Sequence, residues 1–161
     1  KTDIKFKKIS KRGFTLIEML IVIAIIAILS SVFLVGLRGF RAGAYDSRRI
    51  SDLQKVQSYL EILYNANNRA YPDAGSNWNS LKTALESSNL GISNVPSDPV
   101  SGQEYIYCAA SDKQSYILAA KLSTAGHSAL NESYHGDHQD YSCTNPQLDC
   151  SKGTQYLCVK F

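Results

Sequence analysis

Three absences limit what this sequence can encode. It has no proline before Pro72, no charged residue from Met19 to Leu37, and no C-x-x-C pair among its four cysteines. Proline breaks a helix by removing a backbone hydrogen bond and clashing with the preceding turn, so its absence leaves room for one unbroken helix. Without a C-x-x-C pair, the usual cysteine spacing of a structural zinc site is missing.

Basic residues are scarce outside the first 13 positions. Residues 1–13 hold six of the 17 lysines and arginines and one of the 14 acidic residues. The rest of the chain therefore carries 11 basic and 13 acidic residues. A weakly acidic body gives no general reason to expect nucleic acid as a partner, and none is predicted.

The apolar stretch that begins at Phe14 runs to Leu37 and is long enough to span a bilayer of about 30 Å as a helix. The basic residues before it predict that this end stays in the cytoplasm. A secretory signal peptide would place its small-residue cleavage site after the apolar stretch. The plainest alternative is therefore an ordinary signal anchor.

Glu18 argues against an ordinary anchor. A carboxylate in a membrane helix costs roughly 2–3 kcal/mol on insertion scales, so it usually has a partner. The next basic residue, Arg38, lies about 30 Å further along a helix. Cleavage after Gly13 would create a cationic amine on Phe14, one helical turn away, in the same chain or on a staggered neighbour.

The segment Lys11–Glu18 resembles the prepilin peptidase site of type IV pilins and type II secretion pseudopilins. The resemblance covers the chain from Lys11 to about Leu37. It implies cleavage between Gly13 and Phe14 on the cytoplasmic side, followed by methylation of the Phe14 amine. It also implies that Glu18 neutralises the Phe14 amine of an adjacent subunit and so sets the axial register of a filament.

The same resemblance implies the partners and the location. The partners would be copies of the chain in a helical filament, the prepilin peptidase and the assembly platform. The subunit would cross the cytoplasmic membrane once, with its N-terminus inside, before assembly, and would belong to a cell-surface filament afterwards.

The predicted fold is α+β: a type IV pilin fold with a long N-terminal helix packed on a small antiparallel sheet of three or four strands. The predicted parts are a cleaved leader (1–13), a membrane or filament-core half of the helix (14–37), an amphipathic half (38–67) and a globular head (68–161). Apolar residues at helical spacing define the second half; they are Ile50, Leu53, Val56, Leu60, Leu63 and Tyr64.

Alternation and turn residues predict the elements of the head. A short helix is expected from Trp78 to Ser88, and strands are expected at Tyr105–Ala109, Tyr116–Leu122 and Gln155–Phe161. An even number of cysteines beyond a membrane segment predicts disulfides. Three pairings are possible, and we favour one that joins Cys143 to Cys150 and Cys108 to Cys158.

No catalytic residue is predicted, because the chain has no nucleophile-elbow pattern and nothing in the long helix looks catalytic. Two candidate metal sites lie in the tail, residues 126–154: His135 and His138 could share a metal with a carboxylate, and Asp137 and Asp140 could supply oxygens for calcium. Major pseudopilins bind calcium in a glycine- and aspartate-dense C-terminal loop, which this chain lacks. We therefore predict neither a metal site nor another cofactor, with calcium as the minor alternative.

The sequence thus predicts a structural subunit of a type IV pilus-like filament rather than an enzyme. Two alternatives stay open. One is the major pseudopilin of a type II secretion system, and the other is a minor or tip pilin that adheres to a surface or takes up DNA. Minor subunits sometimes lack the glutamate, so Glu18 favours a structural role.

Overall fold

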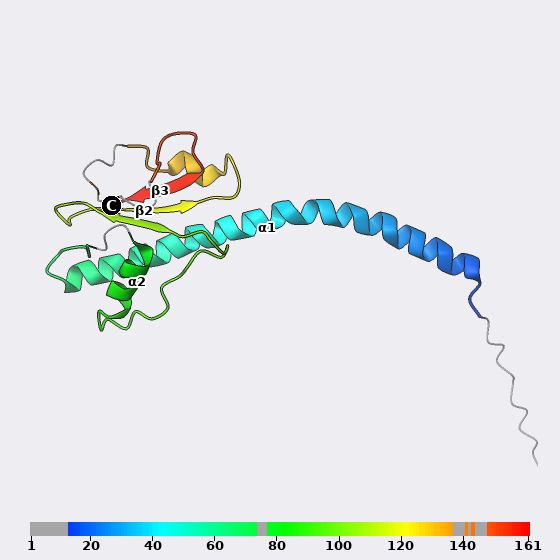
Figure 1. Ribbon diagram of the computed structural model, residues 1–161, viewed down its shortest axis with the longest axis horizontal. Helices are drawn as coiled ribbons and strands as arrows, with labels where there is room; N and C mark the ends of the chain where they lie inside the picture. Colours follow the sequence, from blue (N-terminus) through cyan, green and yellow to red (C-terminus); the bar gives the residue numbers. More distant parts are fainter. Residues whose placement is uncertain (1–12, 74–76, 137–140, 142, 144–147) are drawn as a thin grey trace, which may run out of the picture. The chain divides into compact units, whose positions relative to one another are not determined.

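The computed structural model describes residues 13–73, 77–136, 141, 143 and 148–161, with the side chains of residues 32–38 outside the description. The chain divides into two compact units, and the boundary lies between Gly39 and Phe40. Figure 1 labels the elements. In chain order they are α1 (Leu16–Ala66), α2 (Trp78–Glu86), β1 (Ile106–Ala109), β2 (Tyr116–Lys121), the 3-10 helix η1 (Ser128–Glu132) and β3 (Tyr156–Lys160).

The long helix α1 matches the predicted bounds of 14–67 to within two residues at each end. Its end is set by Asn68 and Arg69, whose φ angles of 49° and 58° are left-handed and cannot continue a right-handed helix. The second helix, α2, begins where Asn77 accepts hydrogen bonds from the backbone N–H groups of Asn79 and Ser80. Such an N-cap satisfies donors that the first turn leaves unpaired.

No helix within the described part of the chain is long and apolar enough to cross a membrane. The span expected over residues 14–37 therefore stays a prediction from the sequence.

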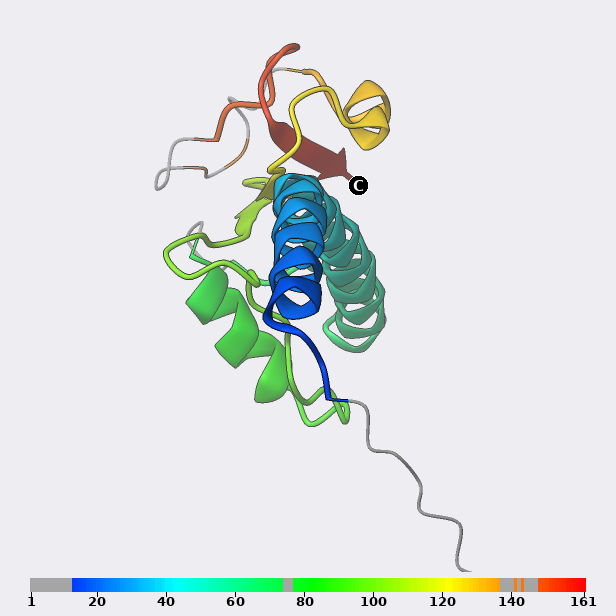
Figure 2. The same cartoon turned by 90° about the vertical axis from the view of Figure 1, so that its right-hand side faces the viewer.

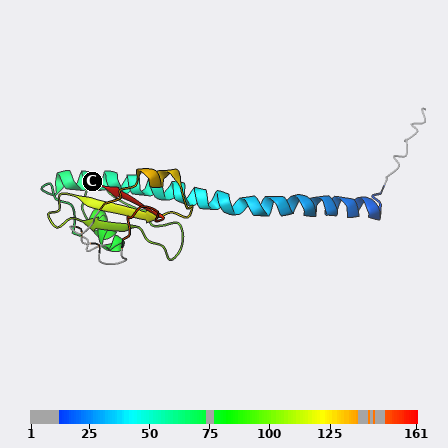
Figure 3. The ribbon, with the colours of Figure 1, turned by 90° about the horizontal axis from the view of Figure 1, so that it is seen from above.

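The three strands form one antiparallel sheet in the order β1-β2-β3, beside the part of α1 that follows Phe40 (Figure 3). Each strand lies within one residue of its predicted bounds at either end. Because side chains alternate across a strand, the sheet has two distinct faces. Both faces are buried, and each belongs to a separate apolar cluster.

The inner face packs on the two helices of the head (Figure 2). The apolar stripe predicted on α1 is confirmed, since four of its members are at most 8% exposed. These are Leu53, Val56, Leu60 and Leu63, and they pack with Trp78, Leu81 and Leu85 of α2 and with Tyr107, Tyr116, Leu118 and Leu157 of the sheet.

The outer face is smaller and is covered by the tail that follows η1. Its five strand residues are at most 2% exposed, and Leu148 and Cys150 of the tail pack against them at 1% exposure. The five are Ile106, Cys108, Ile117, Ala119 and Cys158. The tail also closes the free edge of β3, where Tyr134 N donates to Cys158 O at 2.7 Å and Cys158 N donates to Ser133 Oγ at 2.9 Å.

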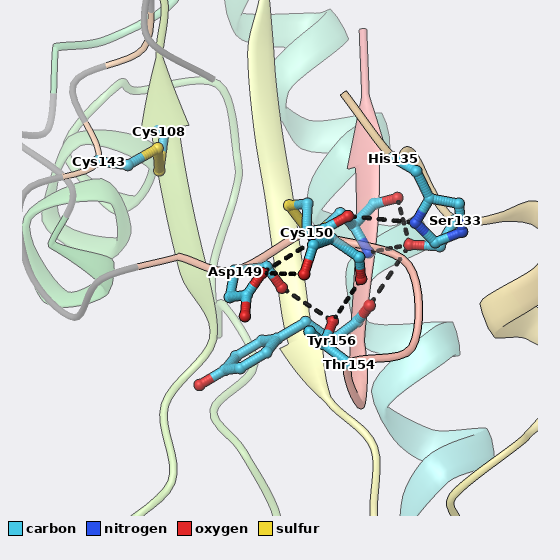
Figure 4. Close-up of a disulfide and its surroundings, with 10 residues drawn as sticks. Cys108, Ser133, His135, Cys143, Asp149, Cys150, Thr154 and Tyr156 are labelled. Carbon is cyan, nitrogen blue, oxygen red and sulfur yellow. Dashed lines mark hydrogen bonds between the residues drawn. A yellow bond between two sulfur atoms is a disulfide. The ribbon is translucent and has the colours of Figure 1, made fainter. Parts of the chain in front are cut away.

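All four cysteines form disulfides, but the predicted pairing is wrong. Cys108 bonds Cys143 and Cys150 bonds Cys158, with Cα–Cα distances of 5.3 and 5.9 Å. Figure 4 labels Cys108, Cys143 and Cys150. Cys108 and Cys158 do share the outer face, but β2 lies between their strands, which separates them by about 10 Å. A disulfide spans only about 4.4–6.8 Å between Cα atoms, so these two cannot pair.

Candidate assembly and processing site

The predicted cleavage pair lies immediately before α1. Gly13, Phe14 and Thr15 are exposed and non-helical, and α1 begins at Leu16. The Phe14 side chain is 80% exposed. The Gly13–Phe14 bond therefore lies in an exposed, non-helical segment that a peptidase could reach.

Glu18 occupies the first turn of α1 and bonds back to Thr15. Its Oε2 accepts hydrogen bonds of 2.7 Å from both the backbone N and the Oγ1 of Thr15. The Glu18 backbone N donates in return to Thr15 Oγ1 at 3.3 Å. This reciprocal pattern is a capping box, in which a threonine at the N-cap and a glutamate three residues later satisfy each other's backbone donors.

The capping box gives Glu18 a local role that the sequence analysis missed. The signal was present, because Thr15 and Glu18 have the T-x-x-E spacing of the motif in front of an apolar run. The box fixes one carboxylate oxygen at the start of α1, next to Phe14. A carboxylate held there is placed to meet a cationic amine, whether of its own chain or of a neighbour.

From Leu16 to Leu29, exposed apolar side chains occur on every side of α1. Twelve large apolar side chains from Phe14 to Leu29 are each between 45% and 83% exposed. They are Phe14, Leu16, Ile17, Met19, Leu20, Ile21, Val22, Ile23, Ile25, Ile26, Ile28 and Leu29. A helix that is hydrophobic all round is stable only when lipid or other protein covers it, so this segment needs a partner outside its own chain.

The second half of α1 is held in the head by Arg49, whose side chain is fully buried. The guanidinium donates to both carboxylate oxygens of Asp98 at 2.7 and 2.9 Å, to Asp46 at 3.0 Å and to Gln103 at 2.9 Å. Asp46 in turn accepts from the backbone N–H groups of Ser123 and Thr124. These contacts join α1, the loop before β1 and the end of β2 in a single network.

This network shifts the pKa values of Arg49 and Asp46 in the direction that keeps both side chains charged. Hydrogen bonding to Asp98 raises the pKa of Arg49, although burial opposes the change. Burial would raise the pKa of Asp46, but hydrogen bonds from Ser123, Thr124 and Arg49 outweigh it and hold that pKa below its usual range. The neighbouring Arg48 is exposed and forms only a weak pair with Asp52, at 3.7 Å.

The described histidines serve the backbone of the tail. His127 Nδ1 accepts a hydrogen bond from Ala129 N at the start of η1, and His135 Nδ1 lies 3.1 Å from Cys150 O (Figure 4). No group of three metal-ligating side chains occurs in the described part of the chain. The other candidate ligands, Asp137, His138 and Asp140, lie outside the described residues, so the calcium alternative stays a hypothesis.

Comparison with known proteins identifies the family. Residues 8–34 match the family described as "Prokaryotic N-terminal methylation motif". The chain is 30% identical to type II secretion system core protein G of Vibrio cholerae serotype O1, over 66% of this chain and 77% of that protein. The chain belongs to the type IV pilin and pseudopilin family. Pilins and pseudopilins are structural subunits, and the α+β architecture described above is a pilin fold.

Two further relatives match the chain over different lengths. Core protein G of Escherichia coli K12 is 29% identical over 67% of this chain and 79% of its own length. The protein of the same name from Klebsiella michiganensis is 38% identical over only 39% of this chain and 44% of its own length. No solved structure matches the chain closely enough to add to this comparison.

Proposed function

We propose that this chain is a structural subunit of a pilus-like filament of the type II secretion kind, that is, a pseudopilin. The observation that carries the proposal is the first half of α1, which exposes apolar side chains on all sides beside a capped, negatively charged first turn. The relatives reported above, all named as type II secretion core proteins, support the pseudopilus over a surface pilus.

In this proposal the apolar half of α1 first lies in the cytoplasmic membrane with the leader inside. Prepilin peptidase cuts after Gly13 and the new Phe14 amine is methylated. Subunits then leave the bilayer at the assembly platform, because the apolar halves of neighbouring helices cover one another and so replace lipid. The head carries no chemistry and serves as the outer surface of the filament.

Pairing of charges would set the axial register. After assembly, apolar side chains of neighbouring helices would surround both the Phe14 amine and the Glu18 carboxylate. An uncompensated charge there is costly, so the favoured stagger is the one that brings the two together. Thr15 restrains one of the Glu18 oxygens, which leaves the other available to the amine.

The processing step is tested by intact-mass and N-terminal peptide analysis of the chain from membranes and from sheared surface material. A chain that begins at methylated Phe14 is expected. A chain that retains the leader in every fraction would overturn the proposal. Loss of protein export on deletion, with little chain in sheared filaments, supports the pseudopilus, whereas abundant sheared filaments would assign the chain to a surface pilus.

Two substitutions at Glu18 separate its charge from its capping role. Glu18→Gln keeps a side chain that completes a capping box, whereas Glu18→Ala keeps neither the cap nor the charge. We expect both variants to be cleaved but to lose most of the protein export that the parent chain supports. Normal export with Gln but not with Ala would show that Glu18 acts through the helix cap instead.

A further inference from the structure

One face of α1, just after the apolar run ends, combines exposed aromatic and cationic side chains. Phe40 is 80% exposed, the Arg48 side chain is 62% exposed, and Arg41, Ala44 and Ser47 are exposed as well. Phe40, Ala44 and Arg48 recur every four residues, and Arg41 precedes Arg48 by two turns, so these positions share one side of the helix. We call these five residues the junction face.

The junction face is positively charged and largely free of compensating acids. The only acidic residue from 40 to 48 is Asp46, which is fully buried and bound to Arg49 on the opposite side of the helix. Arg48 reaches Asp52 only at 3.7 Å, in an exposed pair that contributes little. Within the described residues, Arg41 has no ion pair.

We propose that the junction face binds the phosphate groups of anionic phospholipids at the outer surface of the membrane before the subunit is assembled. The inference rests on the proposed function, which places residues 14–37 in the bilayer. The junction face begins three positions after that stretch, and a helix rises about 1.5 Å per residue, so Phe40 and Arg41 fall in the headgroup layer. Arg48 follows within about a Debye length of that layer.

The side chains suit this ligand. A guanidinium offers a planar fork of donors that matches a phosphate bidentately and is more weakly hydrated than an ammonium. The Phe40 side chain is 80% exposed to water, so its free energy falls when the ring enters the apolar boundary of the headgroup layer. Anionic lipid attracts each basic residue near the surface by about 1 kcal/mol, so Arg41 and Arg48 together are enough to enrich it locally.

The lipid contact of the junction face matters most after the leader has been cleaved. Before cleavage the six basic residues of the leader flank the apolar stretch on the inner side. After cleavage that side keeps only the Phe14 amine and Glu18, whose charges cancel. Arg41 and Arg48 are then the basic residues nearest to the stretch whose side chains the structure describes, so the outer headgroups hold the mature subunit at its depth until assembly.

The test uses the full chain in phospholipid vesicles and the quenching of tryptophan by brominated lipid. Trp78, the one native tryptophan, is buried in the head and supplies the blank. Phe40→Trp reports on the junction face, and Ile25→Trp reports on the apolar half of α1. We expect brominated phosphatidylglycerol to quench Phe40→Trp more than brominated phosphatidylcholine does, with a relative association constant of roughly fivefold for one arginine at the surface and up to about thirtyfold for both.

Charge-removing variants identify the cause of that preference. In Arg41→Gln/Arg48→Gln the preference for the anionic lipid should fall to about one, and added salt should reduce it in the parent. Lys55→Gln/Lys82→Gln removes the same charge from exposed or half-exposed lysines further along the chain and should leave the preference unchanged. Equal losses in the two double variants would overturn the inference.

The control position separates this inference from the proposed function. If Ile25→Trp is quenched but Phe40→Trp is not, the subunit is inserted and the lipid contact is wrong. If neither is quenched, insertion itself fails and the proposed membrane stage falls with it. Quenching of Phe40→Trp by both lipids equally, or protection of it as the protein-to-lipid ratio rises, would overturn the inference too, and protection would assign the junction face to a second copy.

Discussion

The two compact units of this chain treat apolar surface in opposite ways. Before Gly39 the described apolar side chains of α1 are nearly all exposed, and no other element of their own unit covers them. After Phe40 both faces of a small sheet are buried, the network around Arg49 is closed and two disulfides hold the tail. The head is thus complete in one chain, whereas the first half of α1 is complete only with partners.

Stability and assembly are therefore encoded in different parts of the chain. Substitutions in the head should change its free energy of unfolding and leave the apolar segment as it is. Substitutions such as Glu18→Gln should change assembly and leave the head intact.

Arg49→Ala should cause the largest loss of head stability. It leaves Asp46 and Asp98 buried without their cation, and breaking a buried ion pair in this way costs roughly 3–5 kcal/mol. Urea unfolding of the full chain in detergent, followed by Trp78 fluorescence, measures the change. Arg48→Ala is the matched control, since this neighbour is exposed and should cost at most about 1 kcal/mol. Similar losses in both variants would contradict the role of the network.

Removing the disulfides one at a time should rank them by loop length. Cys108–Cys143 joins residues 35 apart and Cys150–Cys158 joins residues 8 apart. The chain-entropy treatment gives losses of roughly 4 and 2.5 kcal/mol for the paired serine variants. Peptide mapping without reductant checks the pairing directly, and a Cys143–Cys150 peptide would contradict the structure.

The disulfides also show which structural features local sequence patterns can predict and which they cannot. Local signals sufficed for α1, α2 and the strands, because helical spacing, turn residues and strand alternation are patterns of neighbouring residues. The same alternation placed Cys108 and Cys158 without revealing that β2 lies between them, since strand order is a long-range property. The partners of Arg49 are 49 to 74 positions away in the loop before β1 and after β2, apart from Asp46 nearby, and no local pattern indicates them.

At the processing site, the residues of interest could be predicted from a local motif. The leader boundary, Phe14 and Glu18 were predicted from a compact motif, and family membership is confirmed, although the roles of these residues remain predictions. The capping box between Thr15 and Glu18 was missed despite being equally local. What sequence cannot supply is the neighbour that covers the apolar half, because that neighbour is another molecule.

Acid should weaken the head through Asp46. Its folded pKa is held below the unfolded value of about 3.9, so its contribution to stability is present above that pH and is lost as the pH falls through the folded pKa. Asp46→Asn should cost roughly 2–3 kcal/mol near neutral pH and should flatten the loss of stability below about pH 4. Urea midpoints of parent and variant across this range measure the effect. An unchanged acid slope would place the responsible carboxylate elsewhere.

Lys113→Gly should give the smallest effect, and it should be a gain. Lys113 lies in the turn between β1 and β2 with φ of 57°, a left-handed conformation that costs a side-chain-bearing residue about 1–2 kcal/mol. Its backbone N donates to Ala110 O and its carbonyl accepts from Tyr71 N, and glycine keeps both bonds. After the added entropy of the unfolded glycine, we expect a net gain of roughly 0.5–1 kcal/mol in head stability. Lys121→Gly, at an exposed position in β2, should instead lose a similar amount, so a loss in both variants would mean that the turn is not strained.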